Sequence, residues 1–325
     1  MRFLLLNQFY PPDVAPTGRY LHDLARAFVR RGHKVKVFCS RSSYDGTGHY
    51  DRHEILDGVE ITRLTATGFG RSGFLGKIAD YASFYVSLLA ALMIERHRPD
   101  VILALTTPPY IGLLAKLAAM RHRSRHAHWI MDLYPDVMLA HGMKRGRFTT
   151  KPLQMLTRFQ FKGAARVLSL GPAMARRVEA YLPSTQIYPS AERRAEGKSG
   201  SASPARTTGR SGWFPLWSDP GLAPWPDDEA NPLRIERKWG LDETIFLYSG
   251  NMGLGHRFGE FLEAAGRLGT SGPRWVFAGG GKRMVEVEAM SRAVPGGRVE
   301  FMGYVPNNLL RAHLCAADVH LVSLD

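Results

Sequence analysis

Short apolar segments alternate along this chain with stretches whose apolar residues recur at helical spacing, and this alternation constrains the fold most. The clearest case lies within Ile245–Leu268, where the apolar run 245–248 leads through three glycines into a helical pattern. The apolar run 275–278, the triple glycine 279–281 and another helical pattern follow in the same order. Alternating β and α units of this length predict a parallel, doubly wound sheet, whose ligands bind at the carboxyl ends of the strands.

The glycine-rich turn after Tyr248 has the features of an anion-binding site. A strand, a turn and a helix in this order direct several backbone N–H groups and the positive end of the helix toward one point. Glycines let an anionic ligand approach the backbone because no Cβ stands in between. His256 and Arg257 stand at the predicted helix start, where acidic residues are usual, and two potential cations there favour a bound anion. An ordinary strand-to-helix connection explains the same pattern without a ligand.

The composition indicates two domains with an uneven charge. A chain of 325 residues, 45% of them hydrophobic, can bury two cores. Residues 1–182 contain 27 Lys and Arg against 13 Asp and Glu, whereas the remainder contains 16 of each. The excess favours anionic partners such as nucleic acid, acidic lipid or a phosphorylated acceptor. Cys39 and Cys315 lie far apart in predicted elements, which suggests neither a disulfide framework nor a zinc site and favours a reducing compartment.

The N-terminal part predicts a βαβ unit with a long first connection. Arg2–Leu6 and Lys34–Phe38 are the predicted strands, and Gly18–Arg31 is the helix between them. The connection 7–18 contains three prolines, so we expect a shaped loop at the strand end rather than a tight turn. Gly18 opens the helix and can lie against a phosphate or a sugar; a rigid surface loop is the alternative. The other polar candidates nearby are Tyr10, Asp13 and Arg19.

The apolar segment Phe74–Ile94 admits three structures. It is nearly long enough to span a bilayer, but Lys77 and Asp80 interrupt it and its flanks are basic. A helix buried in the domain, an interfacial segment and a transmembrane helix therefore all stay open. The interfacial interpretation places Phe69, Phe74 and Leu75 at a membrane surface together with Arg63, Arg71 and Lys77.

Two carboxylates follow another predicted strand, His128–Met131. Asp132 and Asp136, with Tyr134 between them, leave this strand at the edge where ligands bind, and they can hold sugar hydroxyls or act as a base. Asp136 equally suits the N-cap of a helix over 137–141. We predict no metal site, because the nearby histidines lack metal-ligand spacing on one face. These histidines are His126, His128 and His141.

The regular pattern stops after a helix predicted to end near Leu182. Residues 189–212 are rich in Gly, Ser and Arg and have no hydrophobic period, which predicts disorder. A segment rich in proline and tryptophan follows, and we expect it to connect two sheets. The predicted organisation is a first domain (1–182), a disordered insertion and interdomain linker (183–240), and a second domain (241–325).

Taken together, these segments resemble glycosyltransferase family 4. The matching pieces are FYPPDVAPTGRYLHDLARAFVRRGH (9–33), WIMDLYPD (129–136), PLWSDP (215–220), LYSGNMGLGH (247–256), FAGGG (277–281) and FMGYVP (301–306). They follow the family order over nearly the whole chain and are most similar to the bacterial branch that adds N-acetylated sugars to surface polysaccharides. The resemblance implies an α/β, GT-B fold of two Rossmann-like doubly wound domains. It also implies a metal-independent, retaining transfer from a nucleotide sugar, with UDP-N-acetylhexosamine as the expected donor.

The resemblance also implies roles for individual residues. Charge develops on the leaving diphosphate, and preorganised hydrogen-bond donors aimed there lower the barrier. Gly18 would face this diphosphate from the first domain. The implied donor contacts in the second domain are Asn251, Gly253, His256 and Arg257 at the diphosphate, Gly280 and Gly281 at the ribose or phosphate, and Tyr304 and Val305 at the base. The candidate catalytic groups are Asp132 and Asp136, and the candidate acceptor and membrane contacts are Tyr10, Asp13, Arg19, Arg71, Phe74 and Lys77.

The implied partners are a nucleotide sugar, a polyprenyl-diphosphate-linked or saccharide acceptor, and an anionic membrane surface. The expected location is therefore the cytoplasmic, inner face of the plasma membrane, where the protein binds peripherally. No metal or other cofactor is expected. Nucleic acid is not expected either, because the basic residues are not interleaved with aromatic ones on a recognisable module.

The chain departs from the family pattern in several places. Asn251 and His256 stand where many members have Arg and Lys, and Met131 stands where many have His or Gln. Residues 189–212 look inserted. The chain stops at Asp325, before the family's second carboxylate motif, which predicts an incomplete second domain with one face of its sheet uncovered and with weak activity. The alternative function is a truncated, non-catalytic remnant that binds only acceptor or membrane.

Overall fold

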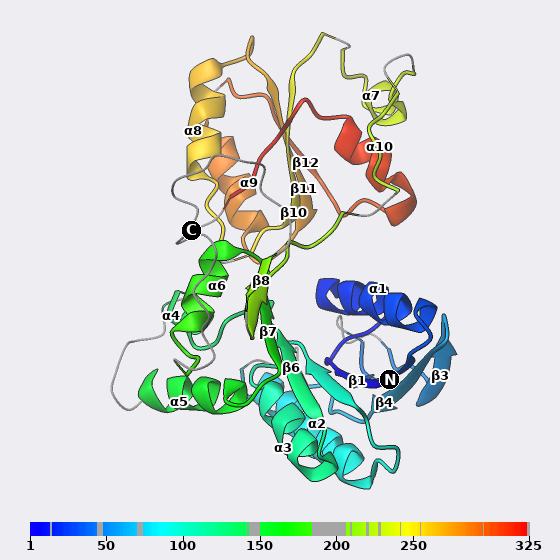
Figure 1. Ribbon diagram of the computed structural model, residues 1–325. Coiled ribbons are helices and arrows are strands. Elements are labelled where there is room, and N and C mark those ends of the chain that lie inside the picture. The colour runs from blue at the N-terminus through cyan, green and yellow to red at the C-terminus, as the bar shows by residue number, and fades with distance from the viewer. Residues whose placement is uncertain are drawn as a thin grey trace, which may run out of the picture. The chain divides into compact units, whose positions relative to one another are not determined.

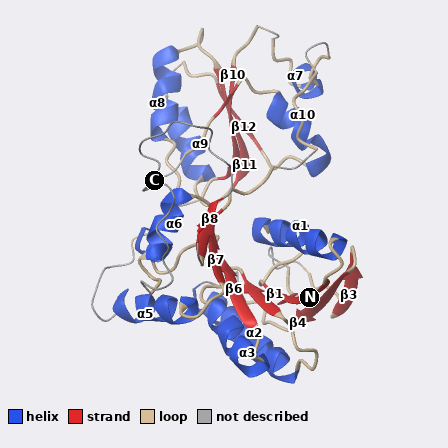
Figure 2. Ribbon diagram, in the orientation of Figure 1, coloured by secondary structure: helices blue, strands red, loops and turns tan. Residues whose placement is uncertain are grey.

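The computed structural model describes the chain apart from residues 14, 44–47, 70–73, 141, 143–149, 184–205, 209, 219–220, 227–228, 241, 254, 295 and 324–325. The chain divides into two units, Met1–Leu216 and Trp217–Asp325, and each is built on its own sheet (Figure 1). Helices flank the strands of both sheets, as α/β alternation in the sequence predicts (Figure 2).

The first unit contains a nine-stranded sheet in the order β3-β4-β2-β1-β5-β6-β7-β9-β8. Its strands are β1 (Arg2–Leu6), β2 (Lys34–Ser40), β3 (His53–Leu56), β4 (Val59–Leu64), β5 (Val101–Ala104), β6 (Arg125–Trp129), β7 (Arg166–Ser169), β8 (Arg206–Thr208) and β9 (Ser211–Trp213). The inner strands pair in parallel, whereas β3 and β8 close the two edges as antiparallel partners of β4 and β9. The parallel core places the loops after β1, β5, β6 and β7 at one edge of the sheet.

The helices of the first unit follow their strands in sequence. They are α1 (Pro16–Arg30), α2 (Phe74–Ile94), α3 (Gly112–His122), α4 (Asp136–Ala140), α5 (Thr150–Phe161) and α6 (Pro172–Glu179). Helix α1 begins with a proline in its first turn, and Gly32 follows its end with a φ of 77°, a conformation that glycine adopts without strain.

Helix α2 is a packed domain helix, which was one of the three structures open from the sequence. Phe84, Leu88 and Leu92 recur every fourth residue and are fully buried against β1, β5 and α3. The interrupting Asp80 is half-buried and accepts hydrogen bonds from Thr67 Oγ1 (2.8 Å) and from the backbone N–H of Phe69 (2.9 Å). Within the described ranges, none of the helices is both long enough and apolar enough to cross a bilayer.

The first unit extends past the boundary predicted at residue 182. Disorder over 189–212 is a wrong prediction for 206–208 and 210–212, because β8 and β9 form a hairpin there. Strand β9 pairs in parallel with β7, so the sheet supplies backbone partners that the polar composition does not reveal. Residues 189–205 lie outside the described part of the chain.

The second unit contains a four-stranded parallel sheet in the order β12-β11-β10-β13. Its strands are β10 (Ile245–Asn251), β11 (Arg274–Gly280), β12 (Val299–Met302) and β13 (Val319–His320). Helices α8 (Gly259–Leu268) and α9 (Met284–Arg292) share one buried cluster with the sheet, and α7 (Pro232–Glu236) and α10 (Leu310–Cys315) share another. A 3₁₀ turn, η3 (Asn307–Leu309), precedes α10.

The expected uncovered face of the second sheet is a wrong prediction for the described residues. Phe258 and Phe277 lie in the buried cluster on the α8 side, whereas Ile245, Val276 and Trp239 lie in the cluster on the other side. Trp239 and α7 come from the segment that the sequence assigned to a linker. These upstream residues supply the cover that the alternation from residue 245 onward does not contain.

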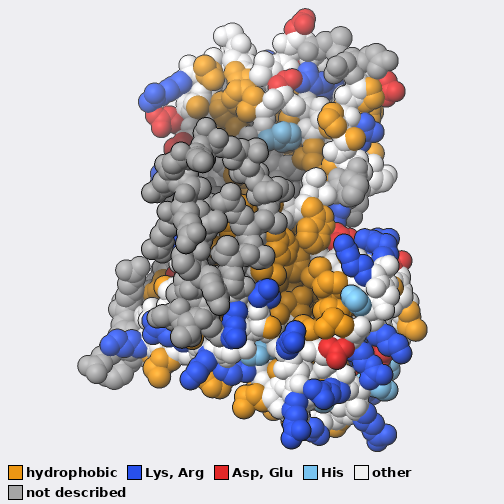
Figure 3. Space-filling model, in the orientation of Figure 1, with side chains coloured by type: hydrophobic (Ala, Val, Ile, Leu, Met, Phe, Trp, Pro, Cys, Tyr) orange, Lys and Arg blue, Asp and Glu red, His pale blue; other side chains and the backbone are white. Residues whose placement is uncertain are grey.

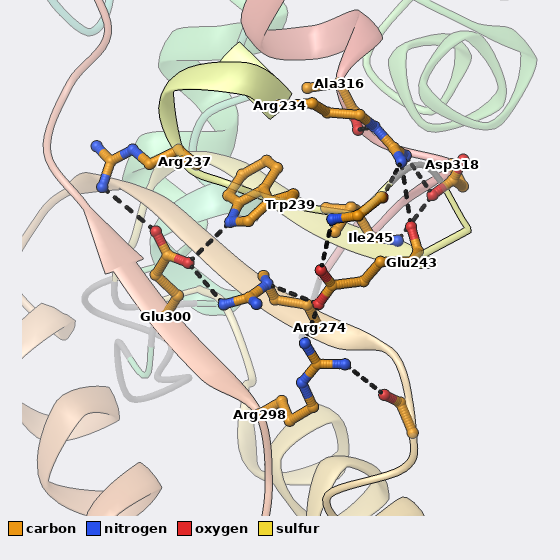
Figure 4. Close-up of polar contacts among 12 residues, drawn as sticks. Arg234, Arg237, Trp239, Glu243, Ile245, Arg274, Arg298, Glu300, Ala316 and Asp318 are labelled. Atoms are coloured by element: carbon orange, nitrogen blue, oxygen red, sulfur yellow. Dashed lines mark hydrogen bonds and ion pairs between the residues drawn. The ribbon is translucent and has the colours of Figure 1, made fainter. Parts of the chain in front are cut away.

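Ionic contacts attach that upstream segment to the amino ends of the second sheet's strands (Figure 4). Glu243 accepts from Arg274 Nε at 2.9 Å and also pairs with Arg298. The contacts of Glu300 are with Arg274 (3.1 Å), with Arg237 (3.3 Å) and with Trp239 Nε1 (3.2 Å). These groups lie at the opposite end of the strands from the predicted ligand edge, so we assign them to stability.

Candidate functional site

The turns after β10 and β11 pack directly on each other at the carboxyl edge of the second sheet. The N–H of Met252 donates to Gly280 O (2.6 Å), and the N–H of Arg283 donates to Met252 O (3.0 Å). Gly279 and Gly281 both have a φ of 126°, and a Cβ at Gly281 would lie 2.6 Å from Met252 O. The turn-on-turn packing therefore requires these glycines, a reason that the sequence interpretation, which invoked only a ligand, did not include.

Tyr304 covers the same pair of turns. Its hydroxyl lies 3.5 Å from Asn251 Oδ1, and a Cβ on Gly280 would come within 2.8 Å of its ring. The side chain is nevertheless 69% exposed. Asn251 is exposed beside it, and Val305 is half-buried. The edge therefore offers an amide and an aromatic face, which suit a polar ligand with a flat ring.

His256 and Arg257 precede the helix rather than belonging to its first turn, since α8 begins at Gly259. His256 Nδ1 lies 2.6 Å from Ser323 O and must donate to it, because a carbonyl only accepts. Nε2 is then an acceptor in the neutral ring, and it becomes a donor to an anion only when the ring is protonated. Arg257 donates its N–H to Ser323 Oγ (2.7 Å), and its guanidinium pairs with Glu260.

Two residues at this edge were missed by the sequence analysis. Arg283 donates from its guanidinium to His256 O and forms a two-bond ion pair with Glu286 (2.9 and 2.6 Å). Ser323 fixes both His256 and Arg257 from a position 66 residues or more along the chain. Contacts at that sequence separation leave no local pattern, although Arg283, two residues after the triple glycine, was a visible cation.

In the first unit, buried groups shape the loop after β1. Tyr10 is fully buried, its hydroxyl lies 2.9 Å from His22 Nδ1, and His22 Nε2 lies 3.0 Å from Asp57 Oδ2. Asp13 is only 7% exposed and accepts from the N–H of Ala15 (3.2 Å). We therefore correct the prediction that Tyr10 and Asp13 contact an acceptor, since both side chains turn inward and hold the loop. Arg19 is exposed and stays a candidate.

Arg63 also holds this loop. Its side chain is fully buried, pairs with Glu54 and donates to the carbonyl oxygens of Tyr10 (3.4 Å) and Pro11 (2.5 Å). The interfacial interpretation placed Arg63 at a membrane, and this burial corrects it. Sequence spacing cannot show that a guanidinium will be satisfied by carbonyl groups more than 50 residues away.

Gly18 lies where α1 packs on the same loop. A Cβ there would come within 2.9 Å of Phe9 O, and the Gly18 N–H donates to Ala15 O (3.0 Å). Close packing thus explains the glycine without a ligand, and its contact with a donor diphosphate stays a prediction. Arg71 and the side chains of Phe74 and Lys77 lie outside the described part of the chain.

The two candidate carboxylates have different surroundings. Asp136 is the first residue of α4. Its carboxylate accepts from the Tyr181 hydroxyl (2.5 Å) and lies 4.0 Å from Arg177 Nη1, so it joins α4 to α6. Asp132 is half-buried in the loop after β6, and its N–H donates to Thr106 Oγ1 (3.2 Å). Asp132 is therefore the better candidate for chemistry.

Aromatic rings surround Asp132. Those of Tyr110 and Tyr134 lie 6.0 Å apart and line a small cavity with it, between the ends of β5 and β6. Burial, with a smaller effect from Asp132, raises the pKa of Tyr134 above its ordinary value. Tyr134 therefore acts as a hydrogen-bond donor rather than as a base.

The predicted absence of metal ligands on one face concerned three histidines. His126 and His128 both direct Nε2 at Gln160 O (3.3 and 3.1 Å), where they satisfy the carboxyl end of α5. Lys116 completes this cap through Phe159 O (2.5 Å) and Lys162 O (3.0 Å). His141 lies outside the described residues. No group of three or more His, Cys, Asp or Glu suited to a metal occurs among those that the structure describes.

Residues 17–187, more than half of the chain, match the glycosyl transferase 4-like domain family. The chain belongs to this family. The glycosyltransferase is 26% identical to WcaI of Escherichia coli strain K12, which is named as a colanic acid biosynthesis glycosyl transferase. The similarity covers 99% of the chain and 76% of WcaI.

Solved structures of low identity share the fold of this glycosyltransferase. WaaG, a glycosyltransferase involved in lipopolysaccharide biosynthesis, matches with a TM-score of 0.62 at 15% identity, over 98% of this chain and 74% of WaaG. HepE from Anabaena, in complex with UDP and glucose, matches with a TM-score of 0.62 at 13% identity, over 98% of this chain and 73% of HepE. The predicted GT-B fold and glycosyltransferase class are confirmed.

Proposed function

We propose that this glycosyltransferase moves a sugar from UDP-N-acetylhexosamine to a lipid-linked or saccharide acceptor, with retention, in the biosynthesis of a cell-surface polysaccharide. The observation that carries the donor half is the edge formed by the turns after β10 and β11, where exposed Tyr304 contacts Asn251, and where Asn251 and His256 both approach Gly253. The names of WcaI and WaaG and the UDP-bound state of HepE support the substrate class.

The proposed chemistry needs no metal or other cofactor. The bond between the anomeric carbon and the diphosphate oxygen breaks as the acceptor oxygen bonds to the same face of the sugar. The proton of the acceptor hydroxyl passes to a base, for which Asp132 is our candidate. Negative charge develops on the diphosphate, and donors from the turn 250–257, with protonated His256 among them, stabilise it.

Calorimetry with UDP, GDP and ADP tests the donor half. We expect heat with UDP, and we expect His256→Gln to weaken UDP binding about tenfold, the worth of one charge-assisted hydrogen bond. His97→Gln is the matched control, because the His97 side chain is 78% exposed in the other unit. Absence of heat with all three nucleotides from a folded protein would reject the donor assignment.

Transfer from labelled UDP-N-acetylglucosamine to a polyprenyl-diphosphate-linked acceptor tests the catalytic half. Turnover that Asp132→Asn lowers 100-fold or more would support the proposal. UDP binding without turnover for any acceptor would instead support the non-catalytic alternative, a protein that binds its ligands only.

A further inference from the structure

Three neighbouring helices of the first unit expose large apolar side chains. Helix α2 contacts α3, and α3 contacts α5 (Figure 1). Their inner sides are buried, as the stripe of Phe84, Leu88 and Leu92 shows for α2. The apolar side chains exposed to solvent are Ile78, Val86, Leu89, Met93 and Ile94 in α2, Leu117 and Met120 in α3, and Met155, Leu156 and Phe159 in α5. We call this set, with the basic residues described next, the basic apolar face.

The charged residues on these helices are mostly basic. The segments 74–98, 112–125 and 150–166 contain 11 Lys and Arg but only two acidic residues, Asp80 and Glu95. Both acids are engaged by other groups: half-buried Asp80 accepts hydrogen bonds from the segment before α2, and the Glu95 side chain is 7% exposed and pairs with Lys36. The exposed cations include Arg121, Arg123, Lys151, Arg158 and Lys162.

A groove runs along α5 within this face. It is lined by Met155, Arg158, Phe159, Lys162, Tyr181 and Leu182 with Pro183, and it encloses about 390 Å³. Its floor is apolar, and Arg158 lies 5.9 Å from the centre of the Tyr181 ring at its side. Apolar space bordered by cations suits an amphiphile with an acidic head group. Figure 3 shows basic and apolar side chains intermixed over the lower part of the view, where these helices lie.

We propose that the basic apolar face lies on an anionic lipid bilayer. Its apolar side chains would enter the head-group region, and its lysines and arginines would contact lipid phosphates. This inference rests on the proposed lipid-linked acceptor and specifies which surface of the first unit meets the membrane. The first unit as a whole contains 32 Lys and Arg against 15 Asp and Glu, which adds long-range attraction to an acidic surface.

A second copy of the chain does not suit this face. A two-fold contact would place the same surface on both partners, so its 11 cations would oppose one another with only two acidic residues, Asp80 and Glu95, in the same segments. A bilayer with acidic head groups offers both the missing negative charge and an apolar layer below it.

Vesicle flotation tests the proposal with the full chain. We expect binding to vesicles of phosphatidylcholine with 30% phosphatidylglycerol, weaker binding at 0.5 M NaCl, and little binding to phosphatidylcholine alone; about one third acidic lipid gives a strong surface potential. Met155→Glu with Phe159→Glu is expected to lower the partition coefficient tenfold or more. Ile55→Glu is the matched control, because Ile55 is 77% exposed on β3 of the same unit but outside the face.

Two double variants that replace basic residues with Glu complete the test. Arg158→Glu with Lys162→Glu is expected to lower the partition coefficient tenfold or more, whereas Arg30→Glu with Arg31→Glu, exposed at the end of α1, should lower it much less. Circular dichroism and UDP calorimetry on each variant separate membrane contact from folding and from the donor site. The proposal would be overturned if the partition coefficient fell equally in the face and control variants. It would also be overturned if a protein that binds UDP did not bind vesicles. Sedimentation showing a dimer that Met155→Glu dissociates would overturn it in favour of self-association.

Discussion

Acid should destabilise the first unit through His128, and the structure gives the size of the effect. This side chain is 1% exposed, and burial, assisted by neighbouring His126, lowers its pKa from 6.5 to about 3. The folded state therefore keeps the ring neutral, whereas the unfolded chain protonates it below pH 6.5. Stability is fully present above that pH and falls as the pH falls toward 3, because the unfolded state binds more protons. Between pH 7.5 and 5.0 the loss amounts to about 2 kcal/mol.

Urea unfolding at pH 7.5 and 5.0 measures this loss in the free energy of unfolding. Hydrogen exchange of peptides that cover β6 assigns the loss to the first unit. His128→Gln should cost about 1–2 kcal/mol at pH 7.5 through altered packing, but it should remove about 2 kcal/mol of the pH-dependent loss. His97→Gln, at a side chain 78% exposed, should leave the loss unchanged. The pKa of His126 is also lowered by burial. The His128→Gln variant should therefore keep a smaller loss of stability at acidic pH. The reasoning would be refuted if His128→Gln lost as much stability between pH 7.5 and 5.0 as the wild-type protein.

Three further predictions concern the site. Gly279→Ala should destabilise the second unit by about 3 kcal/mol or more, because the new Cβ collides with a backbone carbonyl at a φ of 126°, whereas Gly303→Ala, with nothing within 4 Å of the new atom, should change the melting temperature little. His256→Lys should retain UDP binding that His256→Gln loses, and equal affinities in calorimetry would remove His256 from the donor contacts. Asp136→Asn should lower the free energy of unfolding by about 1 kcal/mol without abolishing sugar transfer. Asp132→Asn should abolish transfer with little effect on stability. Equal losses of transfer in the two variants would contradict a structural role for Asp136 and a catalytic role for Asp132.

The layout of both sheets could be predicted because it follows from local signals. Buried strands contain apolar runs, and residues typical of turns, such as Gly250 and Pro108, follow those runs within two or three positions. The loops at the carboxyl edge of each sheet could therefore be located from the sequence alone. Helix α2 was open among three structures, since its inner stripe and its exposed apolar side are alike in composition.

Side-chain direction in those loops could not be predicted. Tyr10 and Asp13 are polar residues in a loop, which usually indicates exposure. Half-buried His22 and buried Arg63 instead form hydrogen bonds to this loop from α1 and β4. The same limit hid β8 and β9, whose composition is that of a disordered segment. Pairing with β7 decides their structure, and a partner strand some 40 residues away leaves no trace in local composition.

The glycines of the second unit limit what a motif can establish about a ligand. Gly279 and Gly281 are required by the packing of one turn on another, so their pattern would persist in a chain that binds no nucleotide. Support for a ligand must instead come from groups whose placement packing does not explain. Tyr304 is such a group, since its ring is 69% exposed at the strand ends, where folding alone would favour a smaller polar residue. His256 is another, because the ring nitrogen Nε2 has no partner among the described residues while Nδ1 fixes its orientation. Tyr304→Ala should therefore reduce UDP affinity in calorimetry while leaving the melting temperature nearly unchanged, and a fall in stability with unchanged affinity would show that the exposed ring serves the fold.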